Sequence, residues 1–256
     1  MTDTPAFAAS IFDMDGLLVD SEPLWHEAEV EILGALGVPL AAGDTRRTKG
    51  MFVGEVTRYW FERHPWAGPG PDAVAAEVVD RVGELVVAKG ALQPGVHRTL
   101  EACRRRGLPL ALASSTEYRL IRLVLGHFSL SEEFVVVHSA EDEPYGKPHP
   151  GVFLSTAEEL GVPAGRCVVW EDAPAGVLAA KAARMACVAV PDPAEADSPA
   201  VALADAVLAS LEEVDDALFE RLVRSHWSDP MAAPGVHRAP GGAQASGPGG
   251  SSTLSK

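Results

Sequence analysis

Short apolar runs recur along the chain, and each one ends at polar or charged residues. Runs of this length, bounded by Gly, Pro or charged positions, are typical of buried strands rather than of helices. The strands predicted in this way span residues 6–12, 108–114, 134–139, 166–172 and 186–192.

Helix-like segments alternate with the four later strands. They span residues 96–106, 117–126, 150–161 and 174–185. An alternation of apolar strands and helices predicts βαβ crossovers, and therefore a parallel sheet with helices on both faces. The pattern indicates an α/β fold with a Rossmann-like parallel-sheet core.

The interval after the first strand breaks this rhythm. It holds only helix-like segments, at residues 22–36, 50–64 and 72–89, separated by the breakers GVPLAAGD and PWAGPGPD. A helical block of this size predicts a smaller second domain joined to the sheet by two linkers. We therefore expect a discontinuous core, residues 1–18 and 93–225, with an inserted helical cap, residues 19–92.

The end of the chain has a different composition. It is rich in Gly, Pro, Ala and Ser and has almost no large apolar side chain. Such a segment cannot offset its ordering entropy by burial. We expect a disordered tail over residues 226–256, without a chemical role.

Charge and cysteine content narrow the class of protein. The 256 residues include 36 acidic and 21 basic side chains, a formal net charge of −15, which argues against a nucleic-acid partner. A small anionic substrate remains compatible, because a local site can oppose the global charge. The cysteines, Cys103, Cys167 and Cys187, lie far apart in the sequence, as expected of reduced thiols. Without an export signal or a long apolar stretch, we expect a cytoplasmic monomer with no membrane partner.

Polar residues follow three of the predicted strands at the point where each strand ends. Asp13 follows the first strand, Ser114 the second, and Glu171 with Asp172 the fourth. Lys147 stands between Gly and Pro just before a helix. Because ligands of open parallel sheets bind at the carboxyl ends of the strands, these side chains are expected in one crevice.

Carboxylates from two strands would repel one another in that crevice unless a cation lay between them. Mg²⁺ suits such a site, and it commonly binds a substrate phosphate together with one or two carboxylates. Ser114 and Lys147 offer the hydrogen bond and the positive charge that hold phosphoryl oxygens. If Asp13 attacks phosphorus, Asp15 is placed to protonate the leaving oxygen and later to deprotonate the hydrolytic water.

Four segments resemble the four motifs of the haloacid dehalogenase-like superfamily, in order: FDMDGLLVDSEP, LALASST, GKPHP and WEDAPAG. The resemblance covers about residues 7 to 225 and implies a Rossmann-like core with a helical cap. It implies that Asp13 is the nucleophile and Asp15 the acid and base. Ser114 would bind phosphate and Lys147 would stabilise charge.

The resemblance also implies a ligand set. Asp13, the backbone carbonyl of Asp15, and Asp172 would hold Mg²⁺, with Glu171 assisting. The residues expected to contact the substrate are Ser114, Ser115, Lys147, Lys49 and Gly50.

Within the superfamily, the sequence is most similar to phosphatases of 2-deoxyglucose 6-phosphate and hexitol phosphates. The segments DSEPLW, PWAGP and KAARM carry this similarity. The segment TRRTKG at residues 45–50 is more basic than that group leads us to expect, which is compatible with a substrate that carries extra negative charge or that lies differently in the site. The implied substrate is a small phosphorylated sugar or polyol.

Two alternatives stay open at this point. A β-phosphoglucomutase has a His where this chain has Trp25, and a cap Arg after a Lys-Gly pair where Met51, Phe52 and Val53 follow here. Both departures favour hydrolysis over mutase chemistry. The other alternative is a catalytically silent module that retains a phosphate pocket.

Overall fold

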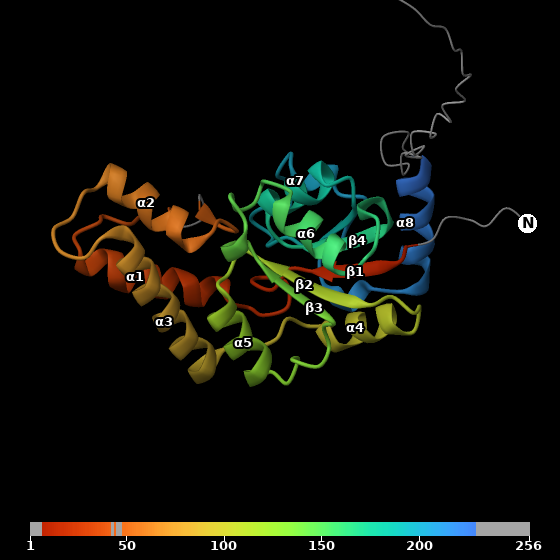
Figure 1. Cartoon of the computed structure of the whole chain (residues 1–256), viewed down its shortest axis with the longest axis horizontal. Helices are drawn as coiled ribbons and strands as arrows, with labels where there is room; N and C mark the ends of the chain where they lie inside the picture. Colours follow the sequence, from red (N-terminus) through yellow and green to blue (C-terminus); the bar gives the residue numbers. More distant parts are fainter. Residues whose placement is uncertain (1–6, 42–43, 45–47, 229–256) are drawn as a thin grey trace, which may run out of the picture.

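A parallel sheet forms the centre of the molecule (Figure 1). The computed structural model describes residues 7–41, 44 and 48–228. Its strands are β1 (Ala9–Phe12), β2 (Leu110–Ser114), β3 (Val136–Ser139), β4 (Cys167–Glu171), β5 (Ala186–Ala189) and β6 (Ala206–Val207). They lie in the order β3-β2-β1-β4-β5-β6, and every neighbouring pair is parallel. The predicted α/β fold is confirmed.

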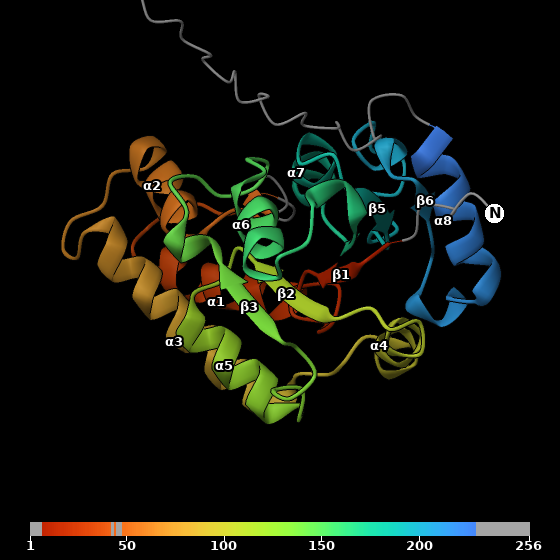
Figure 2. The same cartoon turned by 45° about the vertical axis from the view of Figure 1, so that its right-hand side comes forward.

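Helices connect the strands and cover the sheet (Figure 2). The α-helices are α1 (Glu22–Ala35), α2 (Val53–Arg63), α3 (Pro71–Lys89), α4 (Val96–Arg104), α5 (Tyr118–His127), α6 (Gly151–Glu159), α7 (Pro174–Ala182) and α8 (Asp216–Ser228). Short 3₁₀ turns lie at Ala140–Asp142, Ala164–Arg166, Val201–Leu203 and Leu211–Glu213. None of the helices in the described ranges is long and apolar enough to cross a membrane.

Alternate residues of each strand face opposite sides of the sheet. Phe12 of β1 and Trp170 of β4 stack at 5.6 Å between ring centroids and pack with the apolar faces of α4, α5 and α8. Ile11 and Val169, their neighbours in sequence, pack with α6 and α7. This two-sided burial explains why the strands read as continuous apolar runs.

The helices α1, α2 and α3 form a separate layer at one end of the sheet (Figure 1). We call them the cap helices. The two segments that join them to the sheet lie side by side, because Asp20 donates its N–H to the carbonyl of Ala91 and Gln93 donates to that of Leu18. The cap helices also contact the core through α3 and α5.

The C-terminal part contains elements that were not predicted. The strand β6 has two residues, and α8 packs Leu218 and Leu222 into the core. Helix α8 runs through Ser228, so the first three residues of the expected tail are helical, and His226 is buried. The rest of that expectation, residues 229–256, lies outside the described residues.

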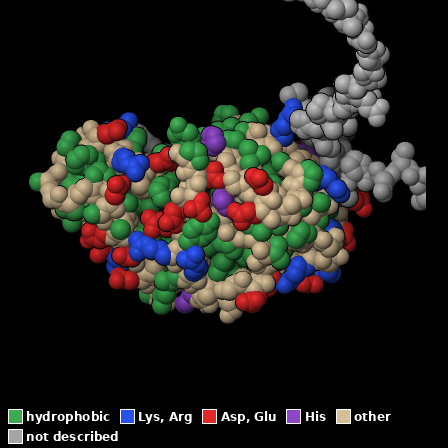
Figure 3. All heavy atoms as spheres, viewed as in Figure 1, with side chains coloured by type: hydrophobic (Ala, Val, Ile, Leu, Met, Phe, Trp, Pro, Cys, Tyr) green, Lys and Arg blue, Asp and Glu red, His purple; other side chains and the backbone are tan. Residues whose placement is uncertain are grey.

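Charged side chains of both signs are interspersed on the face shown in Figure 3. Acidic groups outnumber basic ones over the whole chain. That face carries no broad basic surface of the kind that tracks a nucleic-acid backbone.

Candidate active site

The predicted crevice lies where the chain connections leave β1 and β4 in opposite directions. The ladder between these strands continues for one residue past β1, since Asp13 donates its N–H to the carbonyl of Trp170 over 3.0 Å. That bond places Asp13 beside Glu171, the last residue of β4. A switch point of this kind is the usual ligand site of an open α/β sheet.

Lys147 joins these two carboxylates. Its Nζ lies 2.6 Å from Oδ1 of Asp13 and 2.6 Å from Oε1 of Glu171, and it also donates to the carbonyl of Ala113 over 3.3 Å. Burial disfavours its charge, but the two carboxylates outweigh burial and raise the pKa of Lys147. The ammonium is therefore charged and fixed beside Asp13.

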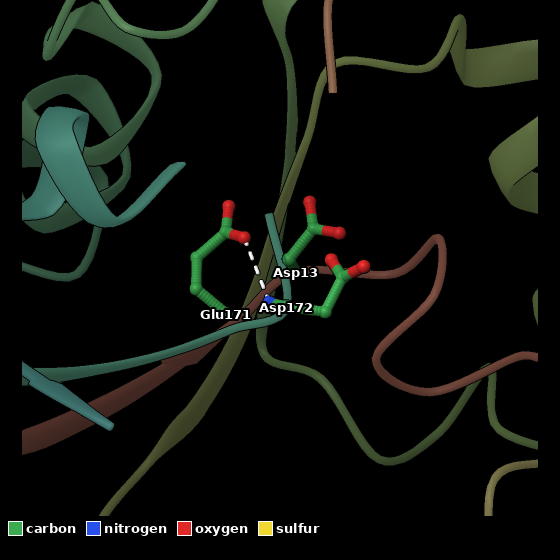
Figure 4. Close-up of side chains that lie close together, drawn as sticks. All are labelled: Asp13, Glu171 and Asp172. Carbon is green, nitrogen blue, oxygen red and sulfur yellow. Dashed lines mark hydrogen bonds between the residues drawn. The ribbon is translucent and has the colours of Figure 1, made fainter. Parts of the chain in front are cut away.

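Three buried carboxylates meet at this point (Figure 4). Oxygen atoms of Asp13, Glu171 and Asp172 all lie within 4.8 Å of one another. Burial raises the pKa of Asp13 and that of Asp172 well above the ordinary value, with Lys147 and Lys49 respectively acting in the opposite direction. A hard divalent cation would favour the ionised form of all three, and carboxylate oxygens are the ligands that Mg²⁺ prefers. The residues present fit such an ion.

Both oxygens of Glu171 have partners within the protein. While Oε1 accepts from Lys147, Oε2 accepts the backbone N–H groups of Asp172 over 2.9 Å and of Ala173 over 3.0 Å. Gly176 of α7 allows this arrangement, since a Cβ there would lie 1.7 Å from Oε1. Glu171 therefore fixes Lys147 and the start of α7 together.

Asp172 has a cationic partner from the other side of the crevice. Lys49 places its Nζ 2.7 Å from Oδ2 of Asp172 and 2.9 Å from Oε2 of Glu195. Gly16, with φ of +78°, passes close to the same carboxylate, because a Cβ there would lie 2.1 Å from Oδ2. The Gly of the DxDG motif is thus required by both its backbone angle and the approach of Asp172.

The carboxylate of Asp15 lies apart from this group of three. Its Oδ1 accepts from Ser21 Oγ over 2.7 Å and from Trp25 Nε1 over 2.8 Å, and its Oδ2 accepts from Thr116 Oγ1 over 2.7 Å. The Trp at the position of the mutase His is therefore a direct partner of Asp15. Three donors, two from the start of α1 and one from the segment after β2, fix the orientation of this carboxylate.

The two serines after β2 have different partners. Ser114 Oγ accepts the N–H of Thr116 over 3.1 Å, which leaves its own hydroxyl proton able to donate to a ligand. Ser115 Oγ instead donates to the carbonyl of Gly50 over 2.8 Å. Gly50 has a φ of +77°, and this bond ties the core to the segment before α2.

The model of the haloacid dehalogenase-like hydrolase family matches residues 7–184. The chain belongs to the haloacid dehalogenase-like hydrolases. The family and the enzyme class that the four motifs predicted are confirmed.

Individual members of the family show how far the likeness extends. Hexitol phosphatase B of Escherichia coli (strain K12) is 42% identical over 207 residues, 80% of this chain and 93% of that protein. Fructose-1-phosphate phosphatase YqaB of the same strain is 32% identical over 179 residues, 70% of this chain and 94% of that protein. A solved β-phosphoglucomutase from Clostridium difficile has 22% identity and a TM-score of 0.76, covering 87% of this chain and 100% of that one. This last likeness concerns the fold.

All the residues predicted for the site of this hydrolase line one cavity between the sheet edge and the cap helices: Asp13, Asp15, Lys49, Gly50, Ser114, Ser115, Lys147, Glu171 and Asp172. Their catalytic, substrate and metal roles stay predictions. The basic segment before Gly50 is described only in part, since Thr45, Arg46 and Arg47 lie outside the described residues.

Several cavity residues of the hydrolase were not predicted. Thr116 holds Asp15, and the face of α1 that carries Trp25 also contributes Glu22, His26 and Glu29. The sequence held a signal for this helix face, because positions three, four and seven residues after Glu22 lie on the same side of a helix. Two acidic residues, Glu22 and Glu29, are unusual on a helix face that is turned toward the rest of the protein.

Proposed function

We propose that this hydrolase is a Mg²⁺-dependent phosphatase that hydrolyses small sugar or hexitol phosphates through an aspartyl-phosphate on Asp13. The observation that carries the proposal is the placement of two carboxylates with separate partners at one cavity. Asp13 is held by Lys147, and Asp15 is held by Trp25 and Thr116. One carboxylate is thereby suited to attack and the other to move protons.

In the first step, an oxygen of Asp13 forms a bond to phosphorus while the bond from phosphorus to the leaving oxygen breaks. Protonated Asp15 gives its proton to that oxygen, so the sugar or polyol leaves as a neutral alcohol. Ser114 and Lys147 lie where they can bind the phosphoryl oxygens. Lys147 stays charged because the carboxylate of Glu171 faces it in both steps, together with that of Asp13 in the free enzyme.

In the second step, water attacks phosphorus and Asp15 takes a proton from it. The bond between phosphorus and Asp13 breaks, which releases phosphate and restores the carboxylate. Mg²⁺ would be held by Asp13, Asp172 and the backbone carbonyl of Asp15, near Glu171, and when bound it offsets the negative charge of phosphate and carboxylates. The hydrogen bonds from Ser21, Trp25 and Thr116 keep Asp15 in place for both proton transfers.

The cap helices supply the other wall of the cavity. We assign residues 19–92 to a cap that closes over the substrate and excludes bulk water, and residues 1–18 and 93–225 to the catalytic core. The names of the two E. coli relatives, hexitol phosphatase B and fructose-1-phosphate phosphatase, support a polyol or sugar as the leaving group. Trp25, which binds Asp15 through its indole N–H, favours hydrolysis over a mutase.

A panel of monophosphates tests this function. The purified chain with Mg²⁺ should release phosphate from hexitol and sugar phosphates faster than from nucleotide monophosphates. Conversion of β-glucose 1-phosphate to glucose 6-phosphate without free phosphate, with a catalytic amount of the bisphosphate, would overturn the proposal in favour of a mutase. No Mg²⁺-stimulated release across the panel would instead support a silent binding module.

A further inference from the structure

Glu29 is a buried carboxyl group in the cavity for which the proposed chemistry has no use. It lies on α1, is 7% exposed, and lines the same cavity as Asp13 and Asp15. Its Oε2 has no hydrogen-bond partner within the described ranges. A buried polar atom in that state costs stability, so its retention needs a reason.

No cation of the described part of the chain forms an ion pair with Glu29, in contrast to the carboxylates of the core. Burial alone raises the pKa of Glu29 to about 8, so its neutral form is well populated at neutral pH. A neutral carboxyl both donates and accepts a hydrogen bond. Its natural partner is a group that does the same, such as a hydroxyl.

The surrounding wall points to the same class of ligand. Glu22 lies two turns before Glu29 on α1 and lines the cavity too, and burial raises its pKa to about 7. Two carboxyl groups on this wall disfavour a second phosphate, because any ionised fraction would repel it. Lys49 lines the same cavity, but its ammonium is paired with Asp172 and Glu195. The apolar lining residues Val53 and Val56 of α2 add no charge that would offset the repulsion.

We propose that Glu29 is a specificity-determining residue that hydrogen-bonds a hydroxyl of the leaving group, and that it selects hydroxyl-bearing monophosphates over bisphosphates. The proposal rests on the proposed function and deepens it. A site that hydrogen-bonds a substrate hydroxyl discriminates strongly, because its own buried polar group is left without a partner when the hydroxyl is missing.

The test compares kcat/KM for a hexitol monophosphate and for p-nitrophenyl phosphate, whose leaving group has no additional hydroxyl. In Glu29→Ala, kcat/KM for the hexitol phosphate should fall about 10- to 100-fold, while the value for p-nitrophenyl phosphate stays within about threefold. In Glu29→Gln, whose amide also donates and accepts a hydrogen bond, kcat/KM for the hexitol phosphate should stay within about threefold of the wild type. Glu31→Gln is the matched control, since Glu31 is an exposed residue of the same helix, paired with Arg81. That control should leave both substrates unchanged.

Thermal melting separates recognition from a structural role. Because Glu29 has no partner to lose, Glu29→Gln should melt at or above the temperature of the wild type. Equal losses on both substrates in Glu29→Ala would overturn the proposal, and so would unchanged kcat/KM for the hexitol phosphate in that variant. If the wild type itself shows no preference for hydroxyl-bearing monophosphates over p-nitrophenyl phosphate, the proposed function fails as well.

Discussion

The cavity has a core wall, formed by residues at the ends of β1, β2 and β4, and a cap wall, formed by residues of α1 and α2. The two walls differ in whether their buried carboxyl groups have a cationic partner. On the core wall each buried carboxylate has a lysine partner: Lys147 pairs with Asp13 and Glu171, and Lys49, from the cap segment, pairs with Asp172. On the cap wall Glu29 has no such partner among the described residues. The buried carboxylates of the core wall therefore have cationic partners before any substrate binds, whereas Oε2 of Glu29 on the cap wall is left without a hydrogen bond.

This difference follows from how each wall is built. Asp13 and Glu171 extend from neighbouring parallel strands whose ladder fixes their separation. Glu29 projects from a helix that is joined to the sheet by two linkers. A rigid sheet edge suits groups that must be held to a fraction of an ångström for chemistry. A separate helical layer suits groups that select the substrate. Substitutions of Asp13, Lys147 and Trp25 and one pH dependence test that division, from the largest expected effect to the smallest.

The largest effect is expected on the core wall. Asp13→Asn removes the attacking oxygen but keeps the shape of the side chain, so kcat should fall by about 10⁴-fold or more. Phosphate release from p-nitrophenyl phosphate measures this, with Asp20→Asn as a control at an exposed carboxylate nearby. Substantial residual activity in Asp13→Asn would contradict the assignment of Asp13 as the nucleophile.

Lys147→Met should affect both activity and stability. It leaves two buried carboxylates without their cation, which costs about 3–5 kcal/mol of unfolding free energy, and it should lower kcat by about 10²- to 10³-fold. Urea denaturation measures the first effect. The double variant Lys147→Met/Glu171→Gln should recover part of the stability and none of the activity. A double variant as unstable as the single one would show that the ion pairs are not what Lys147 contributes.

The pH dependence of stability should reveal the open position on the cap wall. The folded pKa of Glu29, about 8, lies above the ordinary value of 4.5, so its contribution is fully present below pH 4.5 and is lost as pH rises through about 8. The unfolding free energy of the wild type minus that of Glu29→Gln should fall by about 4–5 kcal/mol over that range. A flat difference would contradict the buried, unpaired state of Glu29.

Trp25 of the cap wall contacts Asp15 of the core wall, and the substitution Trp25→Phe is expected to have the smallest effect on activity. Loss of the indole N–H removes one of the hydrogen bonds to Asp15, so kcat should fall about 3- to 30-fold with little change in KM. Trp66→Phe is the matched control, because it removes an indole hydrogen bond to the carbonyl of Pro69 in an exposed part of the cap. A change in KM alone would assign Trp25 to substrate binding rather than to the positioning of Asp15.

The sequence predicted the core wall far better than the cap wall. Asp13 and Asp172 could be found because each follows an apolar run, and the carboxyl ends of parallel strands meet at one edge. The contact between Lys49 and Glu195 joins residues 146 positions apart, and no local pattern encodes such a contact. Strand β6 has two residues and gives no periodicity to detect.

The partners of Asp15 show the same limit at shorter range. Trp25 was singled out by its position, but its bond to Asp15 depends on how α1 leaves the loop after Gly16. Thr116 contacts Asp15 only because β2 lies beside β1. Residue identity was sufficient to predict the family and the enzyme class, whereas the partners that orient Asp15 could be found only in the fold.

The most direct test of the account is to trap the phosphoryl group on Asp13. In Asp15→Asn, p-nitrophenolate still leaves readily because it needs no proton, but the water of the second step lacks its base, so the phosphorylated enzyme should accumulate. After reaction with p-nitrophenyl phosphate radiolabelled in its phosphoryl group and an acid quench, peptide mapping should place a hydroxylamine-sensitive label on Asp13. The variant Asp13→Asn/Asp15→Asn should carry none. Label on another residue, or no covalent label in a preparation that turns over, would contradict the account.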